Sequence, residues 1–498
     1  MIPFLIHELI TSSECFVPDS FCVVDQDRII SRQTVESLSN LIYERIRSFP
    51  HRHTFSLMAI DNSALLVPAL VAASKHQLVS VPVSPNTSAV RLGNIIDGVK
   101  ARLAFTLSPT REFIDVLNNK RIQMIDIASI PTSHRAMAFA ACGSEQGIDT
   151  DPAIGMLTSG TSGGGIKVAC MSHNAIIGVS ESIARYLAIN SRDRILMLPP
   201  SSFDYGLYQI FIASVRGATI IIPPTNVRKY SGELRTFIEQ FDISVLPFTP
   251  SVARLHMKFW RRSDTTMPSV RLITFTGSRF PNDLVNDLKV IFPNARVVPM
   301  YGITEAKRCT FLPEKFYPSK LPSVGIPIPN TRIRVVDSDG NECSAFQEGE
   351  VEICGRNIMN GYHDLDVSSS VKIIGLGLNR RLLTGDVGYT DNDGLLYLNG
   401  RRDDVVKIND HRVSLRNIES VMLTIEAITE CAITFSDACG ITAHIVSRCE
   451  VSDDDINNTV LTYFGEPVFI PRRIIRVSHI PLTEAGKIDY IKLSSELE

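Results

Sequence analysis

A chain of 498 residues is longer than one hydrophobic core usually grows, so we expect two to four structural units. Its hydrophobic share of 44%, its charged share of 21% and its net charge of -3 exclude an intrinsically disordered chain. The same balance gives no reason to expect nucleic acid or a membrane as a partner.

The cysteines indicate a reducing compartment. Ten of them are scattered from Cys15 to Cys449, without a C-x-x-C pair and without zinc-like spacing to the eleven histidines. We therefore expect a reduced, cytoplasmic protein. The apolar start of the chain lacks a basic leader, and no apolar stretch approaches the roughly 20 residues of a membrane helix. Neither a signal peptide nor a membrane segment is expected.

Strand-like and helical segments alternate through the first two-thirds of the chain. Runs rich in β-branched residues predict strands at 153–156, 195–198, 218–222, 272–275 and 295–299. Apolar residues at helical spacing predict a helix over 174–187, with Ser172 as its N-cap. This alternation is typical of an α/β fold with parallel-rich sheets flanked by helices.

The pattern changes towards the end of the chain. From about Gly349, short strands alternate with turns such as Asp391-Asn392-Asp393-Gly394, which predicts a small β-barrel-like subdomain. A charged stretch over 400–404 then precedes a shorter segment of α+β character. We therefore predict an N-terminal domain over 1–400 and a C-terminal domain over 401–498.

A segment rich in threonine, serine and glycine over 157–167 follows the first predicted strand. Its glycines allow backbone N–H groups to approach a polyphosphate, and its hydroxyls and Lys167 add donors and positive charge. It does not satisfy the G-x-x-x-x-G-K-[ST] pattern of a P-loop. Taken alone, it fits either a phosphate-binding loop or a flexible turn.

A second segment, 300–305, follows the strand predicted at 295–299. Tyr301 has a ring that can stack on a purine, and Thr304 has a hydroxyl for a phosphate oxygen. Glu305 has a carboxylate that suits Mg²⁺, although its charge alone would also suit a helix N-terminus. The segment is ambiguous by itself.

Two further segments supply charged groups. Asp386 follows a glycine turn, where a carboxylate can accept two ribose hydroxyls, and Arg401 follows fifteen residues later as a donor to a nucleotide. Gly486 allows a tight turn that presents Lys487. Taken singly, Asp386 also fits ordinary turn chemistry, and Lys487 also fits a solvated surface residue.

In this order, the four segments together resemble the adenylate-forming superfamily of acyl-CoA synthetases, adenylation domains of nonribosomal peptide synthetases, and luciferases. The resemblance spans roughly residues 150 to 490. It implies a large domain that binds ATP and the acid, and a small mobile C-terminal domain that carries a catalytic lysine. It also implies ATP and Mg²⁺ as cofactors, and formation of an acyl-adenylate with release of pyrophosphate.

The resemblance assigns the parts of ATP to particular residues. The phosphates would contact Thr304 and the loop residues Thr158, Ser159, Gly160, Thr161, Ser162, Gly163 and Lys167. Adenine would lie against Tyr301, Gly302 and the segment Thr276-Gly277-Ser278, and the ribose would bind Asp386. Glu305 would hold Mg²⁺.

The same resemblance implies catalytic and hinge residues. Lys487 would stabilise charge on the α-phosphate during adenylation, together with Thr304 and with Arg401 at the domain junction. Asp403 would be the hinge about which the small domain rotates for the second half-reaction.

Two features depart from the family pattern, and a third concerns the substrate. The phosphate loop contains Gly164-Gly165-Ile166 before its lysine, which makes it one residue longer than usual. Asp410 replaces a family glycine beside the channel for a pantetheine thiol, where a carboxylate would hinder thioester formation. Phe203-Asp204-Tyr205 is similar to the segment in which an aspartate pairs with the ammonium group of an amino acid. Asp204 would alternatively orient an attacking amine or serve a turn.

Three functions are compatible with the sequence. The leading hypothesis is a ligase that joins a small carboxylic acid to an amine, resembling amide bond synthetases of secondary metabolism such as coronafacic acid ligase. The second is an acyl-CoA or (amino)acyl-carrier-protein synthetase, which shares the first half-reaction and forms a thioester. The third is a catalytically inactive nucleotide-binding protein, which the altered phosphate loop favours and the set Lys487, Asp386 and Glu305 argues against.

Overall fold

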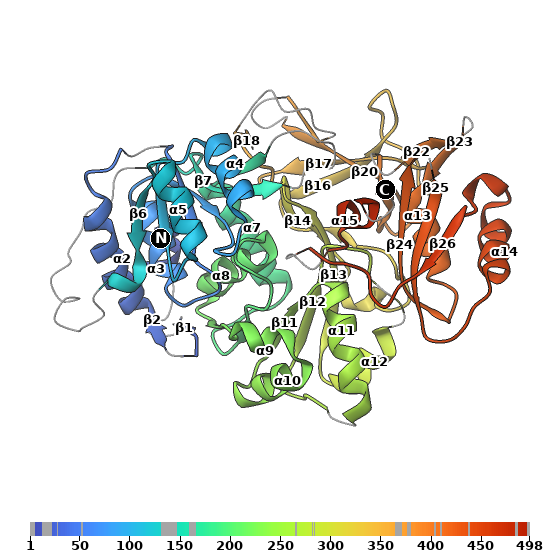
Figure 1. The fold of residues 1–498 in the computed structure, drawn as a ribbon, viewed down its shortest axis with the longest axis horizontal. Helices are drawn as coiled ribbons and strands as arrows, with labels where there is room; N and C mark the ends of the chain where they lie inside the picture. Colours follow the sequence, from blue (N-terminus) through green and yellow to red (C-terminus); the bar gives the residue numbers. More distant parts are fainter. Residues whose placement is uncertain are drawn as a thin grey trace. The chain divides into compact units, whose positions relative to one another are not determined.

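The structure is a computed structural model that divides into two compact units (Figure 1). It describes residues 5–11, 22–26, 28–50, 53–130, 147–158, 166–263, 266–280, 282, 284–363, 371–375, 380–402, 405–408, 411–436, 439–483 and 487–495. The larger unit comprises Met1–Ile333, Ile353–Ser369 and Ile373–Leu382, and the smaller unit comprises Arg334–Glu352, Ser370–Lys372 and Leu383–Glu498.

The first sheet of the larger unit has the strand order β15-β14-β13-β12-β11-β9-β10-β1-β2 within the described residues. The strands from β1 to β13 along this order pair in parallel, whereas β2, β14 and β15 pair antiparallel to their neighbours. The strands are β1 (Cys22–Val24), β2 (Ile29–Ser31), β9 (Arg194–Leu196), β10 (Thr219–Ile221), β11 (Val245–Phe248), β12 (Leu272–Phe275), β13 (Arg296–Ile303), β14 (Ala306–Phe311) and β15 (Ile326–Pro327).

The second sheet of the larger unit has the order β18-β8-β7-β4-β3-β5-β6 in the described part of the chain. It is parallel from β7 to β6, and β8 and β18 extend it antiparallel. The strands are β3 (Phe55–Ala59), β4 (Val79–Pro82), β5 (Leu103–Thr106), β6 (Gln123–Asp126), β7 (Pro152–Thr158), β8 (Lys167–Ser172) and β18 (Gly361–Tyr362).

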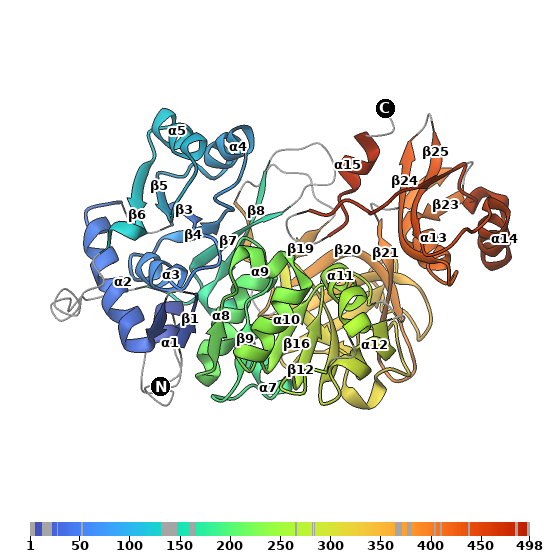
Figure 2. The same cartoon turned by 60° about the horizontal axis from the view of Figure 1, so that its bottom comes forward.

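Helices cover both faces of the two sheets, so the larger unit is built in layers (Figures 1 and 2). One core joins the facing sides of the sheets through α1 (Ile6–Thr11), α2 (Arg32–Ile46), α3 (Leu66–Lys75), α7 (His173–Tyr186) and α8 (Asp204–Arg216). The outer face of the first sheet packs against α9 (Thr225–Lys229), α10 (Ser231–Gln240), α11 (Pro250–Trp260) and α12 (Leu284–Ile291). The outer face of the second sheet packs against α4 (Ala89–Val99) and α5 (Arg111–Asn119).

Side chains alternate between the two faces of a strand, so the first sheet contributes to two hydrophobic cores. In β12, Leu272 belongs to the inner core and Ile273 to the outer core, because successive side chains of a strand point to opposite faces. Both faces of such strands are apolar, as in most parallel sheets. The predicted α/β fold with parallel-rich sheets flanked by helices is therefore confirmed.

The helix predicted at 174–187 is also confirmed, within one residue at each end. It is α7, and the hydroxyl of Ser172 accepts a hydrogen bond of 3.2 Å from the backbone N–H of Ala175. This is the N-cap interaction expected of a serine at that position.

Within the described residues, the smaller unit holds most of a five-stranded sheet of order β16-β17-β20-β19, with β21 paired to β20. Its strands are β16 (Thr331–Val336), β17 (Gly349–Gly355), β19 (Lys372–Ile374), β20 (Arg381–Thr390) and β21 (Leu396–Arg401). The predicted turn joins β20 to β21, where Asp391 Oδ1 accepts hydrogen bonds from the N–H groups of Asp393 and Leu395 at 2.9 and 3.0 Å.

The last part of the smaller unit has its own core between a small sheet and helices. Its elements are β22 (Val405–Ile408), β23 (His411–Ser414), α13 (Leu415–Met422), β24 (Ile428–Ser436), β25 (Gly440–Ser447), α14 (Asp453–Phe464), β26 (Arg473–Arg476) and α15 (Tyr490–Ser495). The compact units do not divide at residue 401, so the domains 1–400 and 401–498 stay a prediction about which parts move together.

No helix in the described part of the chain is both long and apolar enough to span a membrane.

Two buried histidines link the helices of the inner core. His7 Nδ1 lies 2.9 Å from the Ser74 hydroxyl, and His173 Nδ1 accepts a hydrogen bond of 3.2 Å from the N–H of Ile6. Burial lowers the pKa of His7 to about 3 and that of His173 to about 4. Both imidazoles are therefore neutral in the folded protein near pH 5.

These pKa values predict acid lability. Below pH 6.5 the unfolded chain binds protons at both histidines while the folded chain does not, so stability falls as the pH falls. Between pH 6.5 and 5 we expect the free energy of unfolding to drop by about 1.6 kcal/mol per histidine, measured by urea denaturation. His7→Gln should lose about half of this pH dependence. Equal dependence in the variant and the parent would contradict the assignment.

Candidate active site

The strand order of the first sheet predicts where a ligand binds. The chain passes from β9 to β10 on one side and then to β11 on the other side of β9. In open parallel sheets, ligands bind beyond the carboxyl ends of the strands where the order reverses in this way. The connection after β9 leads to Asp204, the first residue of α8. The candidate active site lies at this edge.

Two residues of the β13–β14 hairpin, Thr304 in its turn and Lys307 in β14, hold the Asp204 carboxylate. This carboxylate forms an ion pair with Lys307, whose side chain is only 4% exposed, and accepts a hydrogen bond of 3.3 Å from the Thr304 hydroxyl. The structure thus brings together Asp204 and Thr304, which the sequence analysis placed in separate segments. Sequence reasoning missed Lys307. The structure shows that this lysine lies in a strand of mostly buried residues, β14.

Tyr205 anchors the start of α8 to the sheet. Its hydroxyl lies 2.7 Å from both the carbonyl oxygen and Oγ1 of Thr274 in β12. Burial raises the pKa of this phenol to about 12. Phe203, the N-cap residue of α8, packs edge-on to the Tyr205 ring and against the inner core. The predicted acid-binding segment Phe203-Asp204-Tyr205 therefore also has a structural role.

The segment 300–305 forms the end of β13 and a tight turn into β14. Tyr301 is buried at the end of the strand, and Ile303 pairs with Ala306 across the turn. The helix N-terminus considered for Glu305 is wrong, because the residues that follow it form a strand. Glu305 is buried, and its Oε1 accepts a hydrogen bond of 2.6 Å from the Tyr362 hydroxyl.

Gly302 has a structural reason to be glycine. A Cβ atom at this position would lie 2.5 Å from the backbone nitrogen of Arg308 on the opposite strand. A contact this short requires the hairpin to shift. The predicted contact of Gly302 with adenine stays a prediction, but the close approach of the two strands already accounts for the residue.

The other adenine segment lies beside this hairpin. Strands β12 and β13 are parallel, with Phe275 opposite Pro299, so Thr276-Gly277-Ser278 follows β12 at the same edge as Tyr301. Gly277 has φ +99°, which favours glycine, while Thr276 is buried and Ser278 is exposed. The structure places the two predicted adenine segments at the carboxyl ends of neighbouring strands.

The predicted phosphate loop joins two antiparallel strands. Thr158 ends β7 and Lys167 begins β8, and the two residues are cross-strand partners. Lys167 is buried. Ser159, Gly160, Thr161, Ser162 and Gly163 lie outside the described residues. A P-loop would continue into a helix, so the strand after the loop agrees with the exclusion of that motif.

In the smaller unit, Asp386 and Arg401 face each other on neighbouring strands. They are cross-strand partners of β20 and β21, with Arg401 Nη1 3.6 Å from Asp386 Oδ1. Asp386 is buried, and its N–H donates to the Thr384 hydroxyl at 3.0 Å. Gly385 has φ +74°, and its N–H donates to a carboxylate oxygen of Glu350 at 3.0 Å. The glycine turn predicted before Asp386 is thus a strand position held by Glu350.

Lys487 is exposed in the smaller unit. Leu482 and Ile488 form an antiparallel bridge, and the Lys487 carbonyl accepts a hydrogen bond of 2.7 Å from the N–H of Thr483. The backbone of the lysine is therefore fixed while its side chain reaches solvent. The predicted hinge residue Asp403 and the departure at Asp410 lie outside the described residues.

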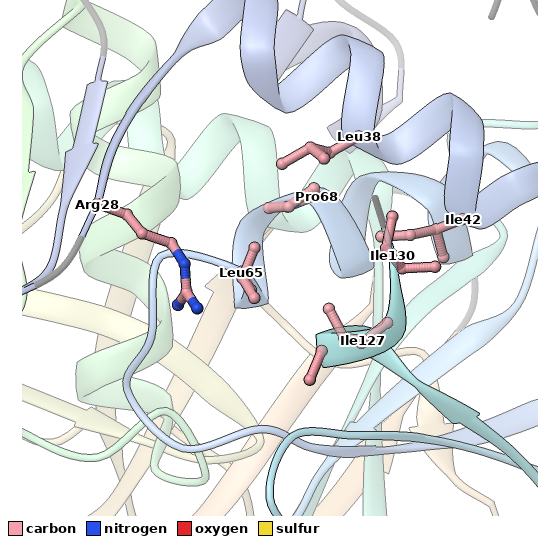
Figure 3. Close-up of a pocket in the computed structure, with 8 residues that line it drawn as sticks. Arg28, Leu38, Ile42, Leu65, Pro68, Ile127 and Ile130 are labelled. Atoms are coloured by element: carbon pink, nitrogen blue, oxygen red, sulfur yellow. The ribbon is translucent and has the colours of Figure 1, made fainter. Parts of the chain in front are cut away.

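A separate pocket in the larger unit contains none of the predicted site residues (Figure 3). It has a volume of about 130 Å³ and is lined by Arg28 and by mostly apolar side chains of Leu38, Ile42, Leu65, Pro68, Ile127, Ala128 and Ile130. Arg28 lies 3.7 Å from Asp25. With its one charged group near a carboxylate, this pocket lacks the donors that a nucleotide requires.

Comparison with known proteins identifies the family of this chain. The family description "AMP-binding enzyme" matches residues 51–363. Zwittermicin A synthase ZmaJ of Bacillus cereus is 25% identical over 499 residues, which cover 97% of this chain and 93% of that protein. The L-proline--[L-prolyl-carrier protein] ligase of Pseudomonas fluorescens is 25% identical over 458 residues, 86% of each chain. Phenyloxazoline synthase MbtB of Mycobacterium tuberculosis is 27% identical over 354 residues, which cover 69% of this chain but only 24% of that longer protein.

Solved structures show the same fold. The o-succinylbenzoate CoA synthetase of Bacillus subtilis, in complex with its acyl-adenylate intermediate, matches with a TM-score of 0.81 at 21% identity and covers 98% of this chain and 97% of its own. Another structure of that enzyme contains ATP and a magnesium ion. Because the family match extends over more than half of the residues, this chain belongs to the AMP-binding enzyme family, the adenylate-forming superfamily of AMP-forming carboxylate ligases.

Proposed function

We propose that this enzyme activates a small carboxylic acid as its acyl-adenylate and transfers the acyl group to a second nucleophile. The observation that carries the proposal is the grouping of Asp204, Thr304 and Tyr301 at the carboxyl edge of the first sheet in an AMP-binding enzyme. A carboxylate oxygen attacks the α-phosphorus of ATP, the bond to the β-phosphate oxygen breaks, and pyrophosphate leaves. The acid then carries AMP as its leaving group.

The charged residues of the chain have distinct tasks in this reaction. We assign the ribose to Asp386, with Arg401 fixing that carboxylate across the strands, and we assign the developing charge on the α-phosphate to Lys487. Phosphate contacts fall to Thr304 and to the loop between Thr158 and Lys167. Two anions meet in this step, so cations must offset their repulsion.

Glu305 fits the part of a magnesium ligand. Mg²⁺ bound to nucleotides commonly takes one or two carboxylates together with phosphate oxygens and water. Glu305 supplies one carboxylate beside Thr304, and the described residues contain no cluster of three metal-binding side chains. A Mg²⁺ that arrives with ATP would supply Lewis-acid stabilisation of the phosphates.

The ion pair between Asp204 and Lys307 affects which carboxylic acid the site can accept. The Asp204 side chain is only 15% exposed, so its carboxylate benefits from a cation, and Lys307 already supplies one from within the chain. An amino-acid substrate is therefore not required to neutralise Asp204. We propose that the acid lacks an ammonium group at this position. The pair also weakens the reading in which Asp204 receives a proton from an attacking amine, since Lys307 and Thr304 already bond to it.

Two acceptors have support. The thiol of a carrier protein or of CoA is favoured by the names of relatives, which include a carrier-protein ligase and a CoA synthetase. An amine, as in amide bond synthetases, is favoured by Asp410 at the position of a family glycine. In either case the nucleophile attacks the acyl carbonyl, its proton goes to a base or to water, and AMP leaves.

Mass spectrometry of products distinguishes these acceptors. The full chain is incubated with ATP, Mg²⁺ and mixed carboxylic acids, and then with CoA, a phosphopantetheinyl carrier protein or a panel of amines. We expect acid-dependent AMP and acylation of one acceptor class, with Asp410→Gly raising the yield of thioester relative to amide. Binding of ATP without acid-dependent pyrophosphate exchange over a broad acid panel would instead support an inactive nucleotide-binding protein.

A further inference from the structure

Arg308 occupies an irregular position in β14. Tyr301 pairs with Thr310 and Ile303 pairs with Ala306, so the single residue Gly302 faces three residues of β14. Arg308 is the middle one of these three, and it has φ +47°, in the left-handed region that non-glycine residues rarely adopt. Such bulges often redirect a side chain beside an active site.

The guanidinium of Arg308 is buried among aromatic and sulfur groups. The residue is 6% exposed, its Cζ lies 4.3 Å from the centre of the Tyr205 ring, and its Nη1 donates to Met300 Sδ at 3.3 Å. Its Nη2 is buried without a hydrogen-bond partner, and no carboxylate in the described part of the chain forms an ion pair with it. The neighbouring Lys307 is the cation that pairs with Asp204.

Tyr208 brings a second donor without a partner. It lies one helical turn after Asp204 in α8, and its hydroxyl is buried with no hydrogen bond to any residue that the structure describes. Burial and the Asp204 carboxylate raise the pKa of this phenol, while Arg308 acts in the opposite direction, so both charges lie within range of the hydroxyl. The phenol is therefore protonated and available as a donor.

Arg308 Nη2 and the Tyr208 hydroxyl are thus two buried donor atoms without a hydrogen-bond partner among the described residues. Burial of this kind is costly, because the groups lose their hydration and the guanidinium gains no counter-ion in exchange. A protein keeps such groups where a ligand completes them. The ligand must be an anion, must reach the carboxyl edge of the first sheet, and must accept hydrogen bonds from a guanidinium and a phenol. The bulge and the left-handed backbone indicate that the hairpin is built to hold Arg308 there.

We propose that the acid activated by this enzyme carries a second carboxylate, which binds the Arg308 guanidinium and accepts a hydrogen bond from the Tyr208 hydroxyl. The inference rests on the proposed acyl-adenylate formation and names the substrate class of that same site. The acid would be a dicarboxylate without an ammonium group at Asp204, because Lys307 already neutralises that residue. One carboxylate is recognised and the other is adenylated.

The test compares dicarboxylic acids of four to eight carbons with the monoamide of each, using pyrophosphate exchange into ATP. We expect the wild-type chain to use at least one diacid with a KM about 10-fold or more below that of its monoamide. Arg308→Gln should raise the KM for the diacid about 10- to 100-fold, which is the range for hydrogen bonds to a charged group. It should leave the monoamide KM almost unchanged.

Two further variants keep the test decisive. Tyr208→Phe should raise the diacid KM about 3- to 10-fold, and Arg261→Gln, which changes an exposed arginine on the surface, should have no effect. The thermal midpoint of Arg308→Gln should equal or exceed that of the parent, since the change removes an unpaired buried charge, whereas the diacid should raise the midpoint of the parent only.

The outcomes separate the two proposals. Exchange with monocarboxylic acids or monoamides but with no diacid, or equal losses on both substrates in Arg308→Gln, overturns the second carboxylate while acyl-adenylate formation stands. No exchange with any acid by the wild-type chain overturns acyl-adenylate formation itself.

Discussion

Replacement of Lys487 by alanine is expected to lower acid-dependent pyrophosphate exchange by about 100-fold or more. The step joins two anions, and losing one preorganised group that stabilises transition-state charge commonly costs that much in rate. The loss should appear in kcat more than in KM for the acid, because the interaction strengthens as charge develops on the α-phosphate. Lys487→Arg should recover only part of the rate, since a planar guanidinium differs from a compact ammonium in reach and shape.

Folding should not be affected by this change. The Lys487 side chain is exposed, and its backbone is held by a hydrogen bond from the N–H of Thr483 to the Lys487 carbonyl and by the bridge between Leu482 and Ile488. Lys492→Ala, in the nearby helix α15, is the matched control, because it removes another exposed lysine of the same unit. Unchanged exchange in Lys487→Ala would remove the basis for assigning adenylation to this residue. An equal loss in the control would show a general effect of charge.

Local patterns were enough to predict the scaffold. The cap of α7 depends only on a serine before an apolar periodic run, and its observed hydrogen bond to Ala175 is local. Strand β12 follows from four apolar and β-branched residues, and its parallel partner β13 was expected from alternating strands and helices. The turn at Asp391 follows from side-chain acceptors next to glycine. Each of these features is decided by residues close together in the chain.

The contents of the site were harder to predict because they depend on distant pairing. Asp204 and Lys307 are separated by 103 positions, and only the docking of α8 beside the β13–β14 hairpin brings them together. A one-residue change in the register of β14 would move Lys307 to the other face of the strand. The bulge that directs Arg308 has no signature in the sequence. Family resemblance identified Thr304 and Glu305, but it did not indicate that the residues after them carry two buried cations.

Replacement of Lys307 by methionine is expected to destabilise the larger unit by about 3–5 kcal/mol. The Lys307 side chain is 4% exposed and that of Asp204 is 15% exposed, so removing one partner leaves the other charge in a poorly solvated environment, and Asp204 would keep only weaker hydrogen bonds such as that from Thr304. Asp204→Asn should destabilise for the same reason, since it takes the carboxylate from a lysine that is 4% exposed. Urea denaturation of each variant measures the loss.

The double variant Asp204→Asn with Lys307→Met gives the sharpest readout. If the two charges serve mainly each other, the double variant should be more stable than either single variant, with a coupling energy of about 2 kcal/mol or more. The pair Lys120 and Asp97 is the control, because it is also a lysine–aspartate ion pair, with an N–O distance of 2.6 Å, but its side chains are 40% and 61% exposed. Lys120→Met should cost less than about 1 kcal/mol. Additive losses in the Asp204 and Lys307 variants would mean that the two charges do not depend on each other, and an ammonium group on the acid would again be a candidate partner for Asp204.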